Sequence, residues 1–195
     1  PILKTTVKPE GTISLLPGVS HGVHPDWAPY YFRRVRVSKV DAVAQALKAL
    51  GMTPYPAPET GAKTLEEAHT WVYEFPIKSP AKRTVYEYTA LEQLERYKLV
   101  MQHYTDHNVS ITVNFERHEI PEIARGVYEN WDHYVGISFL RKDTSVYPLQ
   151  PLEAITEEQY KVAKLLMPDL SRLKETVDAI ERGDYQATDD LDPSC

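Results

Sequence analysis

The sequence predicts an α/β fold, because segments with the residue pattern of strands alternate with segments that have the pattern of helices. Residues 30–38 (YYFRRVRVS) alternate apolar and basic side chains, which is the period of a half-buried strand. Residues 91–104 (LEQLERYKLVMQHY) place apolar side chains at helical spacing, and residues 108–115 (NVSITVNF) alternate again. No internal repeat or clear linker precedes residue 183, so we expect one folded unit over residues 1–182 and a mobile tail over residues 183–195.

Glycines and prolines divide the first half of the chain. Residues 2–7 (ILKTTV) have the β-branched character of a strand, which the following Pro-Glu-Gly ends. Residues 41–50 (DAVAQALKAL) predict a helix that stops at the next glycine. Residues 52–63 are rich in Pro, Gly and Thr and predict a loop. Residues 71–78 (WVYEFPIK) predict a strand whose proline favours an edge or the end of the strand.

Helices predominate in the second half. Residues 119–133 predict a helix with a proline tolerated in its first turn, and residues 136–140 (GISFL) predict a short buried strand. Thr156 opens a further helix, with a capping signal from the Glu and Gln that follow it. Pro168 interrupts this pattern, and residues 170–182 predict a last helix.

Composition argues against several classes of function. The net charge of -6 disfavours a general nucleic-acid binder, because such proteins neutralise phosphates with a basic face. No apolar run approaches the roughly 20 residues of a membrane span, and no signal peptide is visible. The single cysteine, Cys195, cannot make an internal disulfide. The sequence therefore predicts a cytoplasmic protein without membrane or nucleic-acid partners.

The turn PEGTIS at residues 9–14 is the first candidate binding site. A strand, a glycine turn and then hydroxyl residues form an arrangement that aims backbone N–H groups at an anion. Thr12 and Ser14 add hydroxyl donors for phosphate oxygens. The turn is not a Walker loop, because the Gly-Lys-Ser/Thr ending is missing. From these residues alone, a turn without a ligand is the more frequent outcome.

Histidines form two further groups. His21, His24 and Asp26 are possible metal ligands, but zinc needs three or four ligands and the sequence shows no further partner set, so no metal site is expected. His103 and His107 lie four residues apart near a helix end and are predicted to share one face. The glutamate of HExxH is absent, so we interpret them as solvated or capping residues.

Arginines and aromatic residues fill the two longer predicted strands. Arg33 lies on the opposite side of its strand from Arg34 and Arg36. These arginines either bind phosphate or pair with the surplus carboxylates of the chain. Three aromatic side chains share one face of the other strand and are predicted to be core: Trp71, Tyr73 and Phe75.

Five motifs, taken in order, resemble one known family. They are TTVKPEGTISLLPGVSHGVHP, YYFRRVR, VYEFPIK, YTDHNVSITVNF and YPLQPLEAIT. Together they are similar to the carboxy-terminal part of the adenosylcobalamin-dependent (class II) ribonucleotide reductases, closest to the monomeric ribonucleoside-triphosphate reductase type. The resemblance covers nearly the whole chain but only about the last quarter of such an enzyme.

The resemblance implies a fold and a binding site. The chain would be the carboxy-terminal part of a ten-stranded α/β barrel with a flexible acidic tail. In the family, the Pro-x-Gly-Thr-x-Ser turn cradles the phosphates of the ribonucleotide substrate. The implied phosphate-binding residues of this sequence are Pro9, Glu10, Gly11, Thr12, Ile13 and Ser14. Whether the substrate is a diphosphate or a triphosphate stays open.

The resemblance also implies that the chain is not catalytic alone. The family's radical cysteine and reducing cysteine pair would lie upstream, and adenosylcobalamin is the cofactor of the complete enzyme. Cys195 stands about where the first cysteine of the family's redox-active tail would be, so it is a possible tail thiol. The implied partners are an upstream barrel portion or subunit, the ribonucleotide substrate and a thioredoxin-like reductant.

Three interpretations follow from these residues. The first is a piece of a ribonucleotide reductase, either a separate subunit or a fragment of a longer chain. The second is a free-standing nucleotide- or phosphate-binding module without catalysis, and the third is an inactive structural fragment. The first predicts self-association in isolation, because strands meant for missing neighbours expose their edges.

Overall fold

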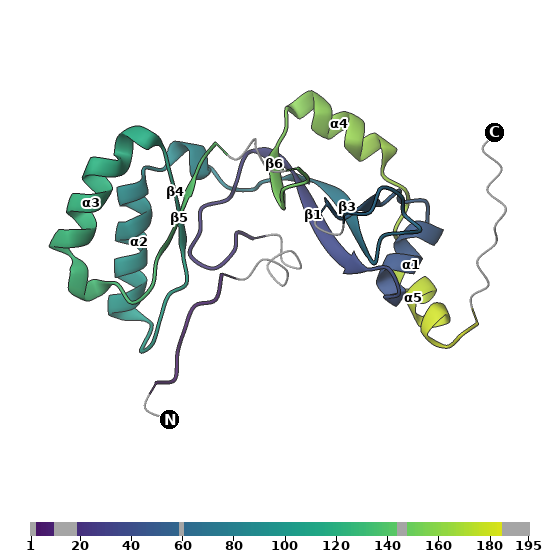
Figure 1. Cartoon of the computed structure of the whole chain (residues 1–195), viewed down its shortest axis with the longest axis horizontal. Helices are drawn as coiled ribbons and strands as arrows, with labels where there is room; N and C mark the ends of the chain where they lie inside the picture. Colours follow the sequence, from purple (N-terminus) through teal and green to yellow (C-terminus); the bar gives the residue numbers. More distant parts are fainter. Residues whose placement is uncertain (1–2, 10–18, 59–60, 144–147, 185–195) are drawn as a thin grey trace. The chain divides into compact units, whose positions relative to one another are not determined.

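The computed structural model describes residues 3–9, 19–58, 61–143 and 148–184 (Figure 1). By its contacts the chain divides into two compact units, Pro1–Tyr31 with Lys78–Tyr147, and Phe32–Ile77 with Pro148–Cys195. Each unit combines two stretches that are far apart in the sequence and has its own apolar core. Whether residues 1–182 fold as one domain, as the sequence suggests, stays a prediction.

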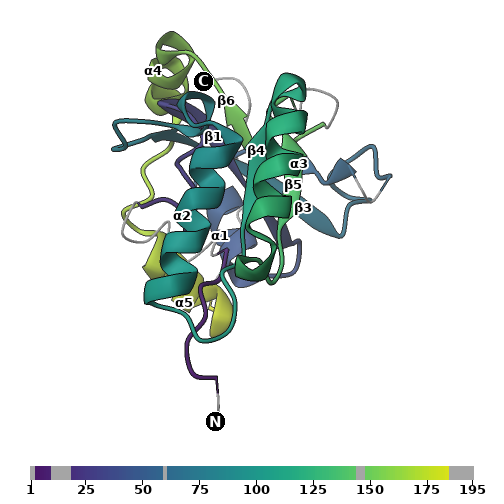
Figure 2. The ribbon, with the colours of Figure 1, turned by 90° about the vertical axis from the view of Figure 1, so that its left-hand side faces the viewer.

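The first unit packs two helices against a short parallel sheet. Strand β4 (Thr112–Phe115) pairs in parallel with β5 (Ser138–Arg141). Helices α2 (Ala90–His103) and α3 (Ile120–Glu129) lie side by side against this pair (Figure 2). Fully buried Leu94, Tyr97, Val109 and Val113 form the centre of the core between them. Among the described residues, short 3-10 helices at Val85–Glu87, Arg117–Glu119 and Trp131–His133 connect these elements.

One buried carboxylate fixes the start of α2. Glu119, which is 8% exposed, accepts a hydrogen bond from the N–H of Ala90 at 2.7 Å through Oε1. Its Oε2 accepts a second bond from the N–H of Glu116, also at 2.7 Å. Because Ala90 is the first residue of α2, its otherwise unpaired N–H is satisfied by a residue that immediately precedes α3. The Glu119 carboxylate therefore links the amino end of α2 to the amino end of α3.

The second unit is built on a sheet with the strand order β2-β3-β1-β6. The strands are β1 (Tyr30–Ser38), β2 (Tyr55–Pro56), β3 (Thr70–Lys78) and β6 (Leu152–Ala154). Helices α1 (Ala42–Ala49) and α5 (Leu173–Glu181) pack together, and the core residues Ala44, Leu47, Trp71 and Tyr73 are buried here. Helix α4 (Glu157–Leu166) buries none of its residues.

Most predicted elements are confirmed, with local reasons visible. β1 has the predicted bounds, and α1 is capped by Asp41, whose carboxylate accepts the N–H of Val43 at 2.8 Å. Thr156 and Gln159 form the predicted cap of α4. The aromatic face of β3 is core, as predicted, with Trp71 and Tyr73 buried and Phe75 packed against them.

Four predictions are wrong in part or in full. The predicted loop at residues 52–63 contains β2, which pairs antiparallel with β3. Residues 3–7, the described part of the first predicted strand, form only a single bridge between Val7 and Val109. The predicted buried strand GISFL becomes β5, all four of whose residues are exposed, because within the described residues β5 pairs only with β4. His103 ends α2 and His107 follows the helix, so the two do not share a helix face.

Candidate functional site

The predicted phosphate loop lies mostly outside the described residues. Of its residues only Pro9 is described, and it is exposed. Glu10, Gly11, Thr12, Ile13 and Ser14 fall in the segment 10–18 that the structure does not describe. The site is therefore defined here by the two chain ends that enter and leave that segment.

The incoming end runs beside the chain that leads into β4. The N–H of Val7 donates to the carbonyl of Asn108 at 3.0 Å, and the N–H of Ser110 donates back to Val7 at 2.9 Å. The hydroxyl of Thr6 also donates to the Asn108 carbonyl, at 2.6 Å. These bonds hold the last residues before the loop in an extended path along the core of the first unit.

The outgoing end touches the incoming end at Gly22. Gly22 has a φ of +50°, and a Cβ built on it would lie 2.4 Å from the carbonyl oxygen of Lys8. Backbone atoms cannot yield as a flexible side chain can, so no other residue fits there without a shift of the chain. Lys8 and Gly22 thus close the base of the loop, and the residues between them leave and return at one place.

His24 fixes the outgoing end to the sheet. Its Nε2 accepts the N–H of Thr112 in β4 at 2.9 Å, and its Nδ1 lies 2.9 Å from the carbonyl of His21. Both contacts are satisfied together by the neutral ring with its proton on Nδ1. Burial lowers the pKa of His24, the hydrogen bond to His21 opposes this, and the charge of Arg96 lowers the pKa further. The ring is therefore a structural link and has no free nitrogen for a metal.

Asp26 is also fully engaged. It is 4% exposed, and its carboxylate accepts bonds from the N–H of Trp27 and the hydroxyl of Tyr31, both at 3.1 Å, and from the hydroxyl of Ser79 at 2.5 Å. Within the described residues, no group of three or more His, Cys, Asp or Glu side chains is placed to hold a metal ion.

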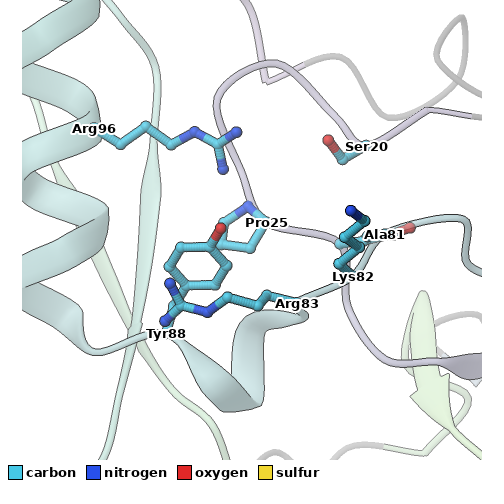
Figure 3. A pocket seen from close by; sticks show the side chains of 8 residues that line it. Ser20, Pro25, Ala81, Lys82, Arg83, Tyr88 and Arg96 are labelled. Carbon is cyan, nitrogen blue, oxygen red and sulfur yellow. The ribbon is translucent and has the colours of Figure 1, made fainter.

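A cation-rich pocket adjoins the outgoing end of the loop (Figure 3). It has a volume of about 230 Å³ and is lined by Ser20, Pro25, Asp26, Ala81, Lys82, Arg83, Tyr88 and Arg96. Three of these eight residues are cationic and one is a carboxylate. Arg96 reaches into the pocket from α2, with Ser20 and Lys82 across from it. No local sequence motif links Lys82, Arg83 and Arg96 to Ser20 and Pro25, because the two groups lie far apart in the chain.

Other sequence candidates have structural roles or lie elsewhere. Arg34 is buried in β1 and pairs with Glu74 and Glu153, each at 2.6 Å, so pairing with carboxylates is confirmed for this arginine. Arg36 donates to the carbonyl of Leu149 at 3.0 Å. Cys195 lies outside the described residues.

Comparison with known proteins gives a clear family. Residues 3–135 match the family described as "Ribonucleotide reductase, barrel domain". The chain belongs to this family. The resemblance drawn from the five motifs is thereby confirmed at the family level. Within the described residues, no helix combines the length and the apolar character that a membrane span requires.

Curated relatives match most of the length of this chain. A probable adenosylcobalamin-dependent ribonucleoside-triphosphate reductase of Dictyostelium discoideum is 32% identical over 88% of the chain and 23% of its own length. An adenosylcobalamin-dependent ribonucleoside-triphosphate reductase of Euglena gracilis is 34% identical over 82% of the chain and 21% of its own length. The chain thus spans less than a quarter of the length of these relatives.

A solved structure confirms the fold class. The crystal structure of a B-12 dependent (class II) ribonucleotide reductase matches 93% of this chain and 24% of its own, with a TM-score of 0.70 and 24% sequence identity. The chain therefore has the α/β fold of part of a ribonucleotide reductase barrel.

Proposed function

We propose that this chain supplies the substrate phosphate-binding loop and the closing barrel elements of an adenosylcobalamin-dependent ribonucleotide reductase. Such an enzyme converts ribonucleotides to deoxyribonucleotides, and the chain is not catalytic alone, since its only cysteine is Cys195. The observation that carries the proposal is the closed loop base at Lys8 and Gly22. It brings together the two chain ends that flank the Pro-x-Gly-Thr-x-Ser motif, in a chain whose family match includes that segment.

The loop residues have separate tasks in this proposal. The backbone N–H groups from Glu10 to Ile13 and the hydroxyls of Thr12 and Ser14 donate hydrogen bonds to phosphate oxygens, and Pro9 shapes the turn. The neutral His24 holds the outgoing end in place through Thr112 without adding charge. The loop therefore binds and orients the nucleotide, and the chemical step takes place on the upstream portion.

Two hollows among the described residues, the cation-rich pocket and a larger one beside α2, do not suit the cofactor of the complete enzyme. When bound, adenosylcobalamin supplies the radical that starts the reaction. The cation-rich pocket, at about 230 Å³, is smaller than the roughly 300–1,000 Å³ typical of small-molecule sites, and a corrin ring is a large ligand. A larger hollow of about 730 Å³ is lined only by Tyr88 and residues of α2, so a single helix face forms it. We assign no residue of this chain to the cofactor.

The remaining partners follow from the same proposal. An upstream barrel portion or subunit supplies the radical cysteine and the reducing pair. A thioredoxin-like reductant serves the tail, in which Cys195 is a possible redox thiol. A cytoplasmic location fits a chain of this family in which no described helix spans a membrane.

A titration with ribonucleotides tests the loop. Thr12→Val with Ser14→Ala removes two hydroxyl donors, and we expect it to weaken ribonucleotide binding at least about tenfold. The same pair of changes in the predicted tail, Thr188→Val with Ser194→Ala, is the matched control and should leave binding unchanged. Equal binding by both double variants would refute the assignment of the loop.

The free-standing binding module is the second candidate, because the cation-rich pocket lies wholly within one unit of the chain. Addition of the upstream barrel portion distinguishes the free-standing binding module from the reductase piece. Ribonucleotide binding that appears only after this addition rules out the free-standing module. Turnover that also appears then establishes the reductase.

A further inference from the structure

The cation-rich pocket carries positive charge that the described residues do not neutralise. Arg83 is engaged: its Nη2 lies 3.0 Å from Glu92 Oε1, and its guanidinium lies 4.0 Å from the centre of the Tyr88 ring. Lys82 and Arg96 neither donate a hydrogen bond nor form an ion pair within the part of the chain that is described. Two cations therefore face one small hollow in a chain whose net charge is -6.

The carboxylates near the pocket have other partners. Glu87 accepts the N–H of Thr84 at 2.8 Å, and Glu95 pairs with Lys98 at 2.6 Å. Glu92 accepts the N–H of Thr89 at 2.8 Å and also pairs with Arg83. The hydrogen bond to Thr89, followed by the one to Arg83, lowers the pKa of Glu92, so it stays ionised in these contacts. The Asp26 carboxylate, as described above, already accepts three hydrogen bonds.

The donors around the pocket suit a phosphate group. Arg96 offers a planar fork of N–H donors, and Lys82 offers a point charge from the opposite side. Ser20 and Tyr88 add hydroxyls to the lining. A terminal phosphate carries about two negative charges and three acceptor oxygens, which match two cations and two hydroxyls. A hollow of about 230 Å³ has room for such a group with water, and not for a whole nucleotide.

The pocket is also within reach of the predicted loop. Ser20 follows Ser14 by only six positions, which span at most roughly 20 Å even when fully extended. The contact of Gly22 with Lys8 returns the chain to the loop base just after Ser20. A polyphosphate held by the loop therefore has a second set of cationic ligands nearby.

We propose that this pocket binds a phosphate group, namely the terminal phosphate of a nucleoside triphosphate, with Arg96 and Lys82 as its charged ligands. The placement of the nucleotide rests on the proposed function. Arg96 and Lys82 then determine the preference for a triphosphate over a diphosphate, while the loop at residues 9–14 binds the phosphates that both nucleotides share.

Calorimetric titration of the 195-residue chain with ATP, ADP and inorganic phosphate tests the pocket. Arg96→Gln and Lys82→Gln change exposed side chains, so the variants should fold, which circular dichroism checks. Each should weaken ATP binding at least about tenfold and change ADP binding less than about twofold. Arg125→Gln, on the exposed face of α3, is the matched control and should change neither.

The outcomes separate the pocket from the loop. If Arg96→Gln and Lys82→Gln leave the ratio of ATP to ADP affinity unchanged, the pocket proposal is wrong, and this result does not test the loop. If they abolish binding of inorganic phosphate and leave ATP binding intact, the pocket is a free-anion site and the terminal-phosphate assignment is overturned. Thr12→Val with Ser14→Ala should weaken the binding of ATP and of ADP equally. If this double variant changes neither affinity, the loop assignment is refuted, and the result for the pocket is unaffected.

Discussion

A single missing side chain decides the geometry of the loop base. Gly22 combines a positive φ with a carbonyl oxygen where its Cβ would be. Gly61 has a similar φ of +66° but no atom within 4 Å of a Cβ built there. Substitution of Gly61 tests the free-energy cost of the backbone conformation alone. Substitution of Gly22 adds the cost of a collision with the Lys8 carbonyl.

We predict that Gly22→Ala destabilises the chain more than Gly61→Ala does. The positive φ costs about 1 kcal/mol in either variant. Gly22→Ala adds a displacement of the Lys8 backbone, for a total of about 2–4 kcal/mol. Urea unfolding measures the difference, and amide hydrogen exchange at Ser110, which donates to Val7, should accelerate only in Gly22→Ala. Equal losses of stability in the two variants would mean that the loop base adapts to a side chain.

At the scale of elements, an ion cluster joins the middle of the four-stranded sheet. Arg34 of β1 has a side chain that is 6% exposed, and it contacts Glu74 of β3 and Glu153 of β6. It also donates to the carbonyl of Gln150 at 3.0 Å. Since β6 has only three residues, this arginine is a main side-chain link between β6 and the rest of the sheet.

We predict that Arg34→Met destabilises the chain by about 2–4 kcal/mol, because it leaves the partly buried Glu74 without its cation. Arg36→Met, on the same strand and exposed, should cost less than about 1 kcal/mol. Both values come from urea unfolding followed by circular dichroism. Adding Glu74→Gln to Arg34→Met should recover part of the loss, and no recovery would show that packing of the arginine, not charge, is what matters.

The elements also show what a sequence can and cannot reveal. β1 and α1 were predictable because alternation, an aspartate cap and a following glycine are local signals. The exposure of β5 was not predictable, because an apolar sequence does not reveal which neighbouring elements cover a strand. The proposed phosphate-binding residues were inferred from a motif, and all of them except Pro9 lie outside the described residues. The pocket was missed because Lys82 and Arg96 meet only through the fold.

At the scale of the whole molecule, large apolar side chains remain exposed. They occur on β5 (Phe139, 42% exposed; Leu140, 41%), near α3 (Tyr128, 83%; Trp131, 70%) and on α4 (Leu165, 85%). The chain spans less than a quarter of the length of the Dictyostelium and Euglena relatives, and we expect these side chains to face neighbours in a longer protein.

We predict that the isolated chain self-associates, through β5 among other surfaces. Sedimentation velocity should show species larger than the 22.3 kDa monomer at micromolar concentration. Phe139→Lys should reduce this association, since a charge on an exposed strand blocks edge pairing. Val40→Lys, at an 88% exposed position in a turn, is the control and should not. A monodisperse monomer at all concentrations would argue against the reductase fragment.

Because each unit combines two separate stretches of the chain, their strands are synthesised at different times. β1 and β3 leave the ribosome before the second stretch of the first unit, residues 78–147, and β6 follows only after it. At roughly 5–20 residues per second, β1 waits on the order of ten seconds for β6. During that interval the sheet of the second unit lacks β6 at one edge, while α2, β4 and β5 of the first unit emerge. A cut of the chain before residue 152 therefore leaves β1 without its partner β6.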